Sequence, residues 1–143
     1  MIKPYEHTAQ YYETDQMGII HHSNYIRWME SARLDYLNQI GCSYKDMEEL
    51  GIISPVLSVS CEYKIPVRFG ETVFIEIKVL KYDGVRFEVA YKMYNKETGE
   101  LCTQCTGKHC FLSKDMKPIS LKRSFLQLHE KILAGIEDDI KNV

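Results

Sequence analysis

The chain has 143 residues, 45% of them hydrophobic, which predicts one domain, residues 1–143, with a core of its own. Its net charge of −2 excludes the strong positive field typical of nucleic-acid binders. We therefore expect no nucleic-acid partner. No apolar run of about 18 residues and no apolar signal segment is present, so we also expect no stable membrane insertion. The five cysteines are an odd number in a chain that needs no disulfides to fold, which predicts a reducing, cytoplasmic location.

The N-terminal part is predicted to form a short strand, a loop and a long helix. The strand is expected over residues 7–12, and the loop after it contains Asp15. Between residues 24 and 40, apolar side chains recur every three or four positions, which is the period of an amphipathic helix. Ser23 is the expected N-cap of this helix, and Gly41 is expected just past its end.

The rest of the chain is predicted to form a second short helix over residues 44–50, then strands and a final helix. Apolar and polar side chains alternate in three segments, as expected for half-buried strands. Asp83-Gly84 predicts a two-residue hairpin, and a fourth strand is expected over residues 100–112. A helix over about 121–133, with Ser120 as its cap, closes the chain. The apolar strand faces are Val59, Cys61, Tyr63, Ile65; Val73, Ile75, Ile77, Val79; and Phe87, Val89, Tyr91, Met93.

This order of elements predicts an α+β fold in which a curved antiparallel sheet wraps around one long central helix. A single sheet with one helix on it has open edges and part of a face left uncovered. Pairing with a second copy of the chain is the economical way to cover them, so we expect a homo-oligomer.

The loop before the long helix carries the chemistry that we regard as most informative. Asp15 stands just ahead of the helix N-terminus, where backbone N–H groups without partners collect partial positive charge. A carboxylate beside such an oxyanion-type site is a plausible device for cleaving an acyl bond.

The surrounding motif resembles that of the hot-dog fold acyl-CoA thioesterases, in particular the 4-hydroxybenzoyl-CoA thioesterase-like and Tol–Pal-associated branch. The resemblance covers roughly residues 11–112. Its most specific part is the spacing from an aspartate through a glycine to His-x-Asn-Tyr and an amphipathic helix. The matching residues are Tyr12-x-Thr14-Asp15-x-x-Gly18-Ile19-Ile20-x-His22-x-Asn24-Tyr25, Trp28-Met29-Glu30-x-Ala32-Arg33 and Tyr63-Lys64-x-Pro66-Val67-Arg68-Phe69-Gly70-Glu71.

The resemblance implies hydrolysis of an acyl-CoA thioester by a homodimer or homotetramer, without a metal or cofactor. It implies that Asp15 acts as nucleophile or as general base on water, and that the His22 backbone N–H is the oxyanion donor. Gly18 would let the loop approach the substrate and would offer a second N–H. Met17 departs from the small residue common in the family, which bears on the size of the acyl pocket. The expected substrate-binding residues are Met17, Asn24, Tyr25, Trp28 and Arg68, with Arg68 a candidate for the CoA phosphates.

Other readings of the sequence stay open. A non-catalytic module that binds acyl-CoA or acyl-carrier protein would use the same fold and pocket. A hot-dog dehydratase is disfavoured because the long helix carries Glu30 but no histidine, and a serine triad because no Gly-x-Ser-x-Gly motif is present. Adjacent histidines diverge, which argues against a metal site at His21 and His22. Cys102 and Cys105 are expected to be buried small residues on opposite strand faces.

Overall fold

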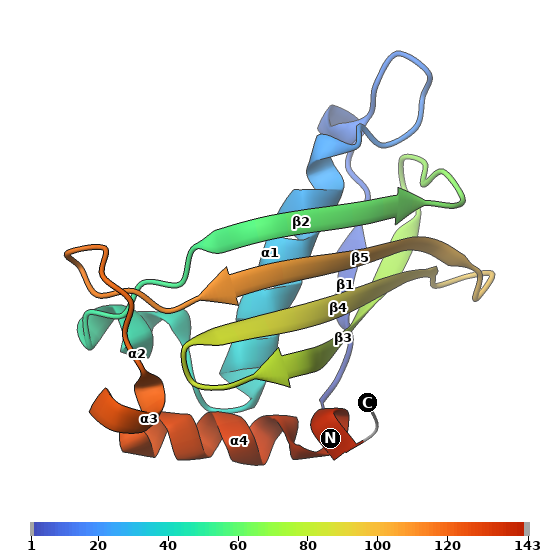
Figure 1. The fold of residues 1–143 in the computed structure, drawn as a ribbon. Helices are drawn as coiled ribbons and strands as arrows, with labels where there is room; N and C mark the ends of the chain where they lie inside the picture. The colour runs from blue at the N-terminus through green and yellow to red at the C-terminus, as the bar shows by residue number, and fades with distance from the viewer. Residues whose placement is uncertain (1, 142–143) are drawn as a thin grey trace.

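The structure is a computed structural model that describes residues 2–141. Its strands are β1 (Tyr5–Thr8), β2 (Val56–Tyr63), β3 (Thr72–Tyr82), β4 (Arg86–Asn95) and β5 (Leu101–Cys110). Its helices are η1 (Tyr11–Glu13, 3-10), α1 (Ser23–Gln39), α2 (Tyr44–Glu49), α3 (Leu121–Ser124) and α4 (Leu126–Lys141). The strands form one antiparallel sheet in the order β1-β3-β4-β5-β2, and α1 crosses it (Figure 1). The predicted α+β arrangement is confirmed.

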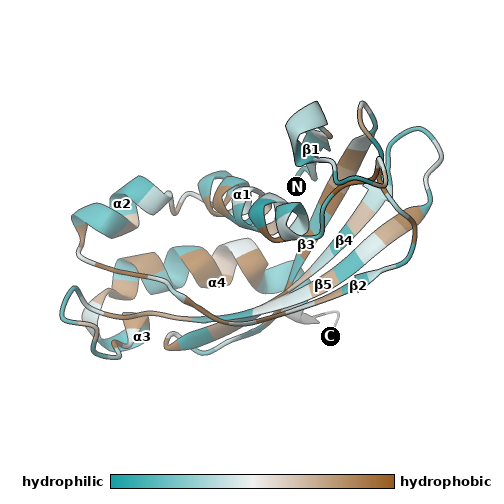
Figure 2. Cartoon of the chain, turned by 90° about the horizontal axis from the view of Figure 1, so that it is seen from above, coloured by the Kyte–Doolittle hydropathy of each residue, from teal (hydrophilic) through white to brown (hydrophobic). Residues whose placement is uncertain are grey.

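The core lies between the sheet and the two long helices, which are on the same side of the sheet (Figure 2). The alternation predicted for β3 and β4 is confirmed, because Val73, Ile75, Val79, Phe87, Val89, Tyr91 and Met93 are buried and Ile77 is partly buried against the same core. From α1, five apolar side chains at helical spacing meet them: Tyr25, Trp28, Met29, Ala32 and Tyr36. Each fully buried aliphatic or aromatic side chain of this kind contributes about 1.5–3 kcal/mol to folding.

The N-terminal strand is shorter than predicted and begins earlier. Strand β1 pairs with β3 only from Tyr5 to Thr8, and residues 11–13 form a 3-10 turn where the continuation of the strand was expected. The prediction for residues 9–12 was wrong because of local hydrogen bonding. The Gln10 N–H donates to the Glu13 carboxylate at 2.8 Å, and the Thr14 N–H donates to the Tyr11 carbonyl at 3.1 Å.

Helix α1 has nearly the predicted length but a different N-cap. His22 is the N-cap residue and Ser23 is the first helical residue, so the prediction of Ser23 as N-cap was wrong. The Ser23 hydroxyl is instead hydrogen-bonded to His21 Nδ1 at 2.9 Å. At the other end the prediction is confirmed, since Gly41 follows the C-cap with φ +85°, a backbone conformation that glycine adopts without strain.

Two further boundaries differ from the predictions. The β3–β4 hairpin has a three-residue loop, residues 83–85, because the Asp83 carboxylate accepts the N–H groups of Val85 and Arg86 at 2.9 and 2.7 Å. The final helix begins as predicted, with the Ser120 hydroxyl accepting the Arg123 N–H, but it breaks at Phe125 and resumes as α4. The prediction of an end near residue 133 was wrong, because α4 continues to Lys141. Phe125 has φ −140° and ψ +61°, which no helix accommodates.

Strand β2 is an edge strand and is exposed along most of its length. Its predicted apolar face is only partly covered by α1, because Val59, Tyr63 and Ile65 remain 37–50% exposed. Cys61 lies between them and is in contact with Met29 of α1. No helix within residues 2–141 combines the length and the apolar character needed to cross a bilayer.

Candidate active site

Asp15 lies in a tight loop between η1 and α1 that its own backbone and side chain close. The Asp15 N–H donates to the Ile19 carbonyl at 2.8 Å, and the Gly18 N–H donates to the Asp15 carbonyl at 3.1 Å. Asp15 Oδ1 accepts the Met17 N–H at 2.8 Å. Gly18 has φ +79°, a backbone conformation that glycine adopts without strain, so this turn favours glycine. The other carboxylate oxygen, Oδ2, accepts no hydrogen bond from the part of the chain that the structure describes.

The loop is held against the segment before β3. The Ile20 N–H donates to the Val67 carbonyl at 2.8 Å, and Ile19 and Arg68 form an isolated antiparallel bridge. Arg68, predicted to meet the CoA phosphates, therefore lies beside the Asp15 loop, although 53 positions separate it from Asp15 in the chain. Its side chain is exposed.

Among the described residues, the N-terminus of α1 leaves one backbone donor without a partner. The Ser23 N–H donates to His21 Nδ1 at 3.2 Å, and the N–H groups of Asn24 and Tyr25 donate to the carbonyls of His21 and His22. For the His22 N–H, residues 2–141 provide no acceptor. A free N–H at this end of a helix is a suitable donor to an anionic oxygen. The Gly18 N–H, the second predicted donor, is instead occupied by the Asp15 carbonyl.

The residues on α1 that were predicted to bind substrate make contacts with other residues of the same chain. Asn24 Nδ2 donates to the Glu13 carbonyl at 2.9 Å, and Trp28 Nε1 donates to Glu13 Oε2 at 2.7 Å. Tyr25 is 4% exposed and contacts the rings of Trp28 and Tyr63, with centroids 5.0 and 5.1 Å away. Burial raises the pKa of Tyr25, so its phenol stays neutral at pH 7. Met17, by contrast, is 74% exposed at the tip of the loop.

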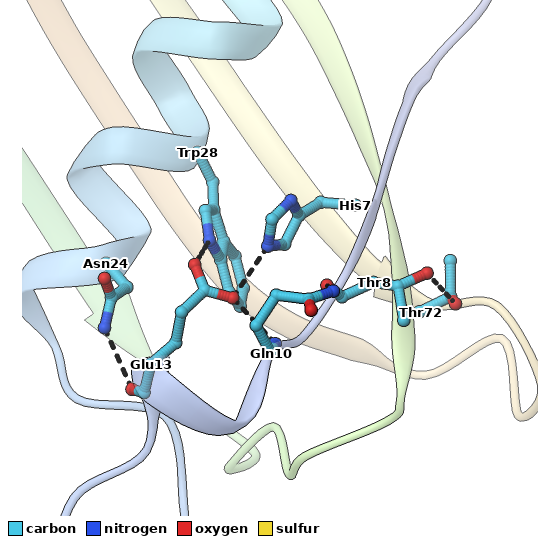
Figure 3. Close-up of polar contacts among 7 residues, drawn as sticks. All are labelled: His7, Thr8, Gln10, Glu13, Asn24, Trp28 and Thr72. Carbon is cyan, nitrogen blue, oxygen red and sulfur yellow. Dashed lines mark hydrogen bonds and ion pairs between the residues drawn. The ribbon is translucent and has the colours of Figure 1, made fainter.

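Glu13 is the polar residue of this region that the sequence analysis missed (Figure 3). It is 5% exposed, and its carboxylate accepts three hydrogen bonds, from Trp28 Nε1, from His7 Nε2 at 2.9 Å and from the Gln10 N–H. The His7 ring also lies against the Trp28 indole, with centroids 4.6 Å apart. Gln10-x-x-Glu13 has the spacing of a capping box, which was the only local signal for part of this network.

The Glu13 network fixes the start of the Asp15 loop to the start of α1. The Glu13 carbonyl accepts both Asn24 Nδ2 and the His21 N–H, the latter at 2.8 Å. Burial alone would raise the pKa of Glu13, but the hydrogen bonds from His7, Trp28 and Gln10 more than offset it and leave the pKa below its usual value. Glu13 is therefore a carboxylate at neutral pH, and its role is to hold neighbouring segments together through hydrogen bonds.

The candidate site is open in a single chain. A small apolar cavity of about 30 Å³ lies between α1, α4 and the sheet, and a groove of about 1030 Å³ runs past β1 and α1, but neither is lined by Asp15, Gly18 or His22. Large apolar side chains around the loop are exposed instead: Tyr11, Tyr12, Met17, Tyr63 and Phe69, at 50–82%. Within residues 2–141, no three His, Cys, Asp or Glu side chains are placed to hold a metal ion.

The chain is similar in sequence and in fold to known proteins. Residues 10–128 match the Thioesterase-like superfamily. A Bacillus subtilis relative, provisionally named acyl-CoA thioesterase YneP, is 38% identical over 85% of this chain and 88% of its own length. The crystal structure of a DHNA-CoA thioesterase from Staphylococcus aureus superimposes with a TM-score of 0.88 at 41% identity, covering 92% of this chain and 89% of that one. A hypothetical protein from Aquifex aeolicus does so with a TM-score of 0.79 at 29% identity, covering 87% and 96%.

These likenesses confirm the hot-dog fold and the resemblance to acyl-CoA thioesterases that the Asp15 motif predicted. At the level of the family they also confirm the predicted enzyme class, a thioester hydrolase. The finer assignment to the Tol–Pal-associated branch stays a prediction. The chain belongs to the thioesterase-like superfamily.

Proposed function

We propose that the protein hydrolyses acyl-CoA thioesters to a carboxylic acid and CoA, with Asp15 as the reacting carboxylate. The observation that carries the proposal concerns two groups for which residues 2–141 provide no hydrogen-bond partner. They are one oxygen of the half-buried Asp15 carboxylate and the His22 N–H at the start of the helix that follows the Asp15 loop. The names of the Bacillus subtilis and Staphylococcus aureus relatives support the same reaction class.

In the proposed reaction the thioester carbonyl oxygen accepts a hydrogen bond from the His22 N–H. Asp15 Oδ2 then attacks the carbonyl carbon, the CoA thiolate leaves, and water hydrolyses the resulting mixed anhydride. In the alternative route Asp15 removes a proton from a water molecule that attacks directly. The His22 donor stabilises the developing oxyanion in both routes, a contribution of typically about 3 kcal/mol.

A second copy of the chain is proposed to complete the acyl pocket. The support is the exposure of the apolar ring of side chains around the Asp15 loop together with the uncovered β2 edge, since an exposed edge strand with an apolar face is a surface for pairing. We therefore expect a homodimer or homotetramer, with Arg68 near the mouth of the site where CoA phosphates would lie. Light scattering on the purified protein measures the subunit number, and a monomer would contradict this part.

The decisive experiment compares wild type with Asp15→Asn on acetyl-CoA, octanoyl-CoA and DHNA-CoA, with free CoA quantified by chromatography so that protein thiols do not contribute. The Asn side chain keeps an oxygen for the Met17 N–H, so the loop should retain its shape. We expect kcat to fall by about 100-fold or more in Asp15→Asn. Asp115→Asn, an exposed aspartate in the loop before α3, is the matched control and should behave as wild type.

Two outcomes would count against the proposal in different ways. Equal rates for wild type and Asp15→Asn would remove Asp15 from the chemistry. Tight binding of acyl-CoA without turnover by either protein would instead favour a non-catalytic acyl-CoA-binding module.

A further inference from the structure

Two cysteines on neighbouring strands face each other beneath the β2 edge. Cys61 of β2 is the direct antiparallel partner of Cys105 of β5. Both are free thiols, as are the other cysteines of the chain, Cys42, Cys102 and Cys110. Of the five, only Cys61 and Cys105 have a cysteine as their registered partner; Cys110, for example, is opposite Arg86.

The strand register places this pair where a disulfide can close. The Lys64 N–H donates to the Cys102 carbonyl at 2.8 Å, which makes the neighbouring pair Tyr63 and Thr103 a non-hydrogen-bonded one. Pair types alternate along an antiparallel ladder, so Cys61 and Cys105, two positions further along, form a non-hydrogen-bonded pair as well. The Cα atoms of such pairs are about 4.5 Å apart. That spacing lies within the range of about 4.4–6.8 Å found for disulfides.

The two thiols differ in exposure and in acidity. Cys61 is partly exposed on an edge strand, whereas Cys105 is 3% exposed on the inner face of the sheet. The hydrogen bond from the Cys105 thiol lowers the pKa of Cys61 to about 7, and that same interaction, together with burial, raises the pKa of Cys105. A thiolate within reach of solvent beside a protonated thiol is the arrangement in which the first is oxidised and the second resolves it.

We propose that Cys61 and Cys105 are a reversible redox site, oxidised by a hydroperoxide to a cross-strand disulfide. The Cys61 thiolate attacks one peroxide oxygen, the O–O bond breaks, and Cys61 becomes a sulfenic acid while the second oxygen leaves and takes up a proton as water, or as an alcohol for an organic hydroperoxide. The Cys105 sulfur then attacks the Cys61 sulfur and displaces the hydroxyl, which leaves as a second water with the Cys105 proton. Two thiols are thereby oxidised to one disulfide and one hydroperoxide is reduced.

The surroundings of the pair favour this chemistry over simple packing. Cys61 Sγ lies 3.8 Å from Met29 Sδ, so its side chain faces α1 and not the open strand edge. Pairing of β2 with a second copy would therefore leave the Cys61–Cys105 geometry in place. A buried small residue would need no cysteine opposite it, and the Met29 thioether beside Cys61 is a polarisable packing neighbour.

Hydrogen peroxide is the probe for the test. The full-length protein is treated with a small molar excess, remaining thiols are alkylated, and intact mass and protease peptides are analysed. With alkylation carried out after unfolding, we expect three alkyl groups on the oxidised protein against five on the reduced protein. We also expect one linked peptide pair containing Cys61 and Cys105, and full return of both thiols with dithiothreitol. Because the reading is taken on wild type, it does not depend on any variant folding.

Three variants sharpen the result, with circular dichroism as the check on folding. Cys61→Ser should form no disulfide, and Cys105→Ser should accumulate a sulfenic acid at Cys61 that dimedone traps. Cys42→Ser, which removes a fully buried thiol elsewhere, should form the disulfide as wild type does. Oxidation of Cys105 before Cys61, direct conversion of Cys61 to a sulfinic acid in wild type, or no reaction of either thiol would each overturn the proposal.

Discussion

Replacing Glu13 by alanine should destabilise the fold more than the same substitution at an exposed glutamate. In Glu13→Ala three donors lose their acceptor: Trp28 Nε1, His7 Nε2 and the Gln10 N–H. Trp28 is 2% exposed, so its stranded N–H costs about 2 kcal/mol, whereas His7 and Gln10 are half-buried and cost about 0.5 kcal/mol each because water reaches them. The expected loss of unfolding free energy is therefore about 3 kcal/mol.

Glu13→Gln should be milder, for a reason that the geometry supplies. The Gln oxygen can take the place of Oε2 and keep the Trp28 bond, while its NH₂ group takes the place of Oε1 and donates to His7 in its other tautomer. Only the Gln10 N–H is then without an acceptor, which costs about 0.5 kcal/mol, as in Glu13→Ala. The order of stability should be wild type, Glu13→Gln, Glu13→Ala.

Urea unfolding measures this order, and Trp28 is a built-in reporter because it is the one tryptophan of the chain. Glu49→Ala, an exposed glutamate on α2, is the control and should change stability by less than about 0.5 kcal/mol. If Glu13→Ala unfolds at the same urea concentration as Glu49→Ala, the network in Figure 3 contributes nothing to stability and the reasoning fails.

Two other predictions concern the core. Burial and the neighbouring Arg33 charge lower the pKa of His109 to about 4, so the unfolded chain binds this proton more readily and stability should fall by up to about 3 kcal/mol from pH 6.5 to pH 4. His109→Asn, which keeps an acceptor for Arg33, should flatten that slope in urea titrations at several pH values. Gly135→Ala should lower the melting temperature, with a cost of about 1–3 kcal/mol, because the new Cβ would lie 2.6 Å from Ile40 Cβ; an unchanged or raised value would show that helix propensity outweighs this contact.

The parts of the fold that the sequence predicted well are those set by neighbours in the chain. Helix α1 follows from apolar groups at every third or fourth position, and β3 and β4 follow from strict alternation. The 3-10 turn at residues 11–13 replaced a predicted strand because Glu13 turns back to Gln10. Phe125 lies within an apolar helical pattern, so no local signal marked the break there.

For the candidate site, the Asp15 motif was evident in the sequence, but the Glu13 hydrogen-bond network that holds its loop was not. Asp15, Gly18 and His22 lie within eight positions of each other, so their order carries information. The Glu13 carboxylate, by contrast, joins His7 of β1 to Trp28 of α1, and a bond across fifteen residues has no spacing rule. Asn24 and Trp28, which were predicted to bind substrate, both donate hydrogen bonds to Glu13 in the structure.

The two neighbouring acids, Glu13 and Asp15, differ in how many hydrogen bonds their carboxylates accept. Glu13 is buried with its carboxylate filled by three donors, and such a group is a poor nucleophile because attack would first break those hydrogen bonds. Asp15 makes its one short side-chain hydrogen bond, at 2.8 Å, through Oδ1 to the Met17 N–H. Glu13 ties the start of the loop to α1 through its carbonyl, and Asp15 closes the loop through its backbone and Oδ1, which leaves Oδ2 for the proposed reaction. At the start of α1 the N–H groups of Ser23, Asn24 and Tyr25 have acceptors, whereas the His22 N–H has none in the part of the chain that the structure describes. Within residues 2–141, Asp15 Oδ2 and the His22 N–H are left as an acceptor and a donor, and the proposed hydrolysis uses both.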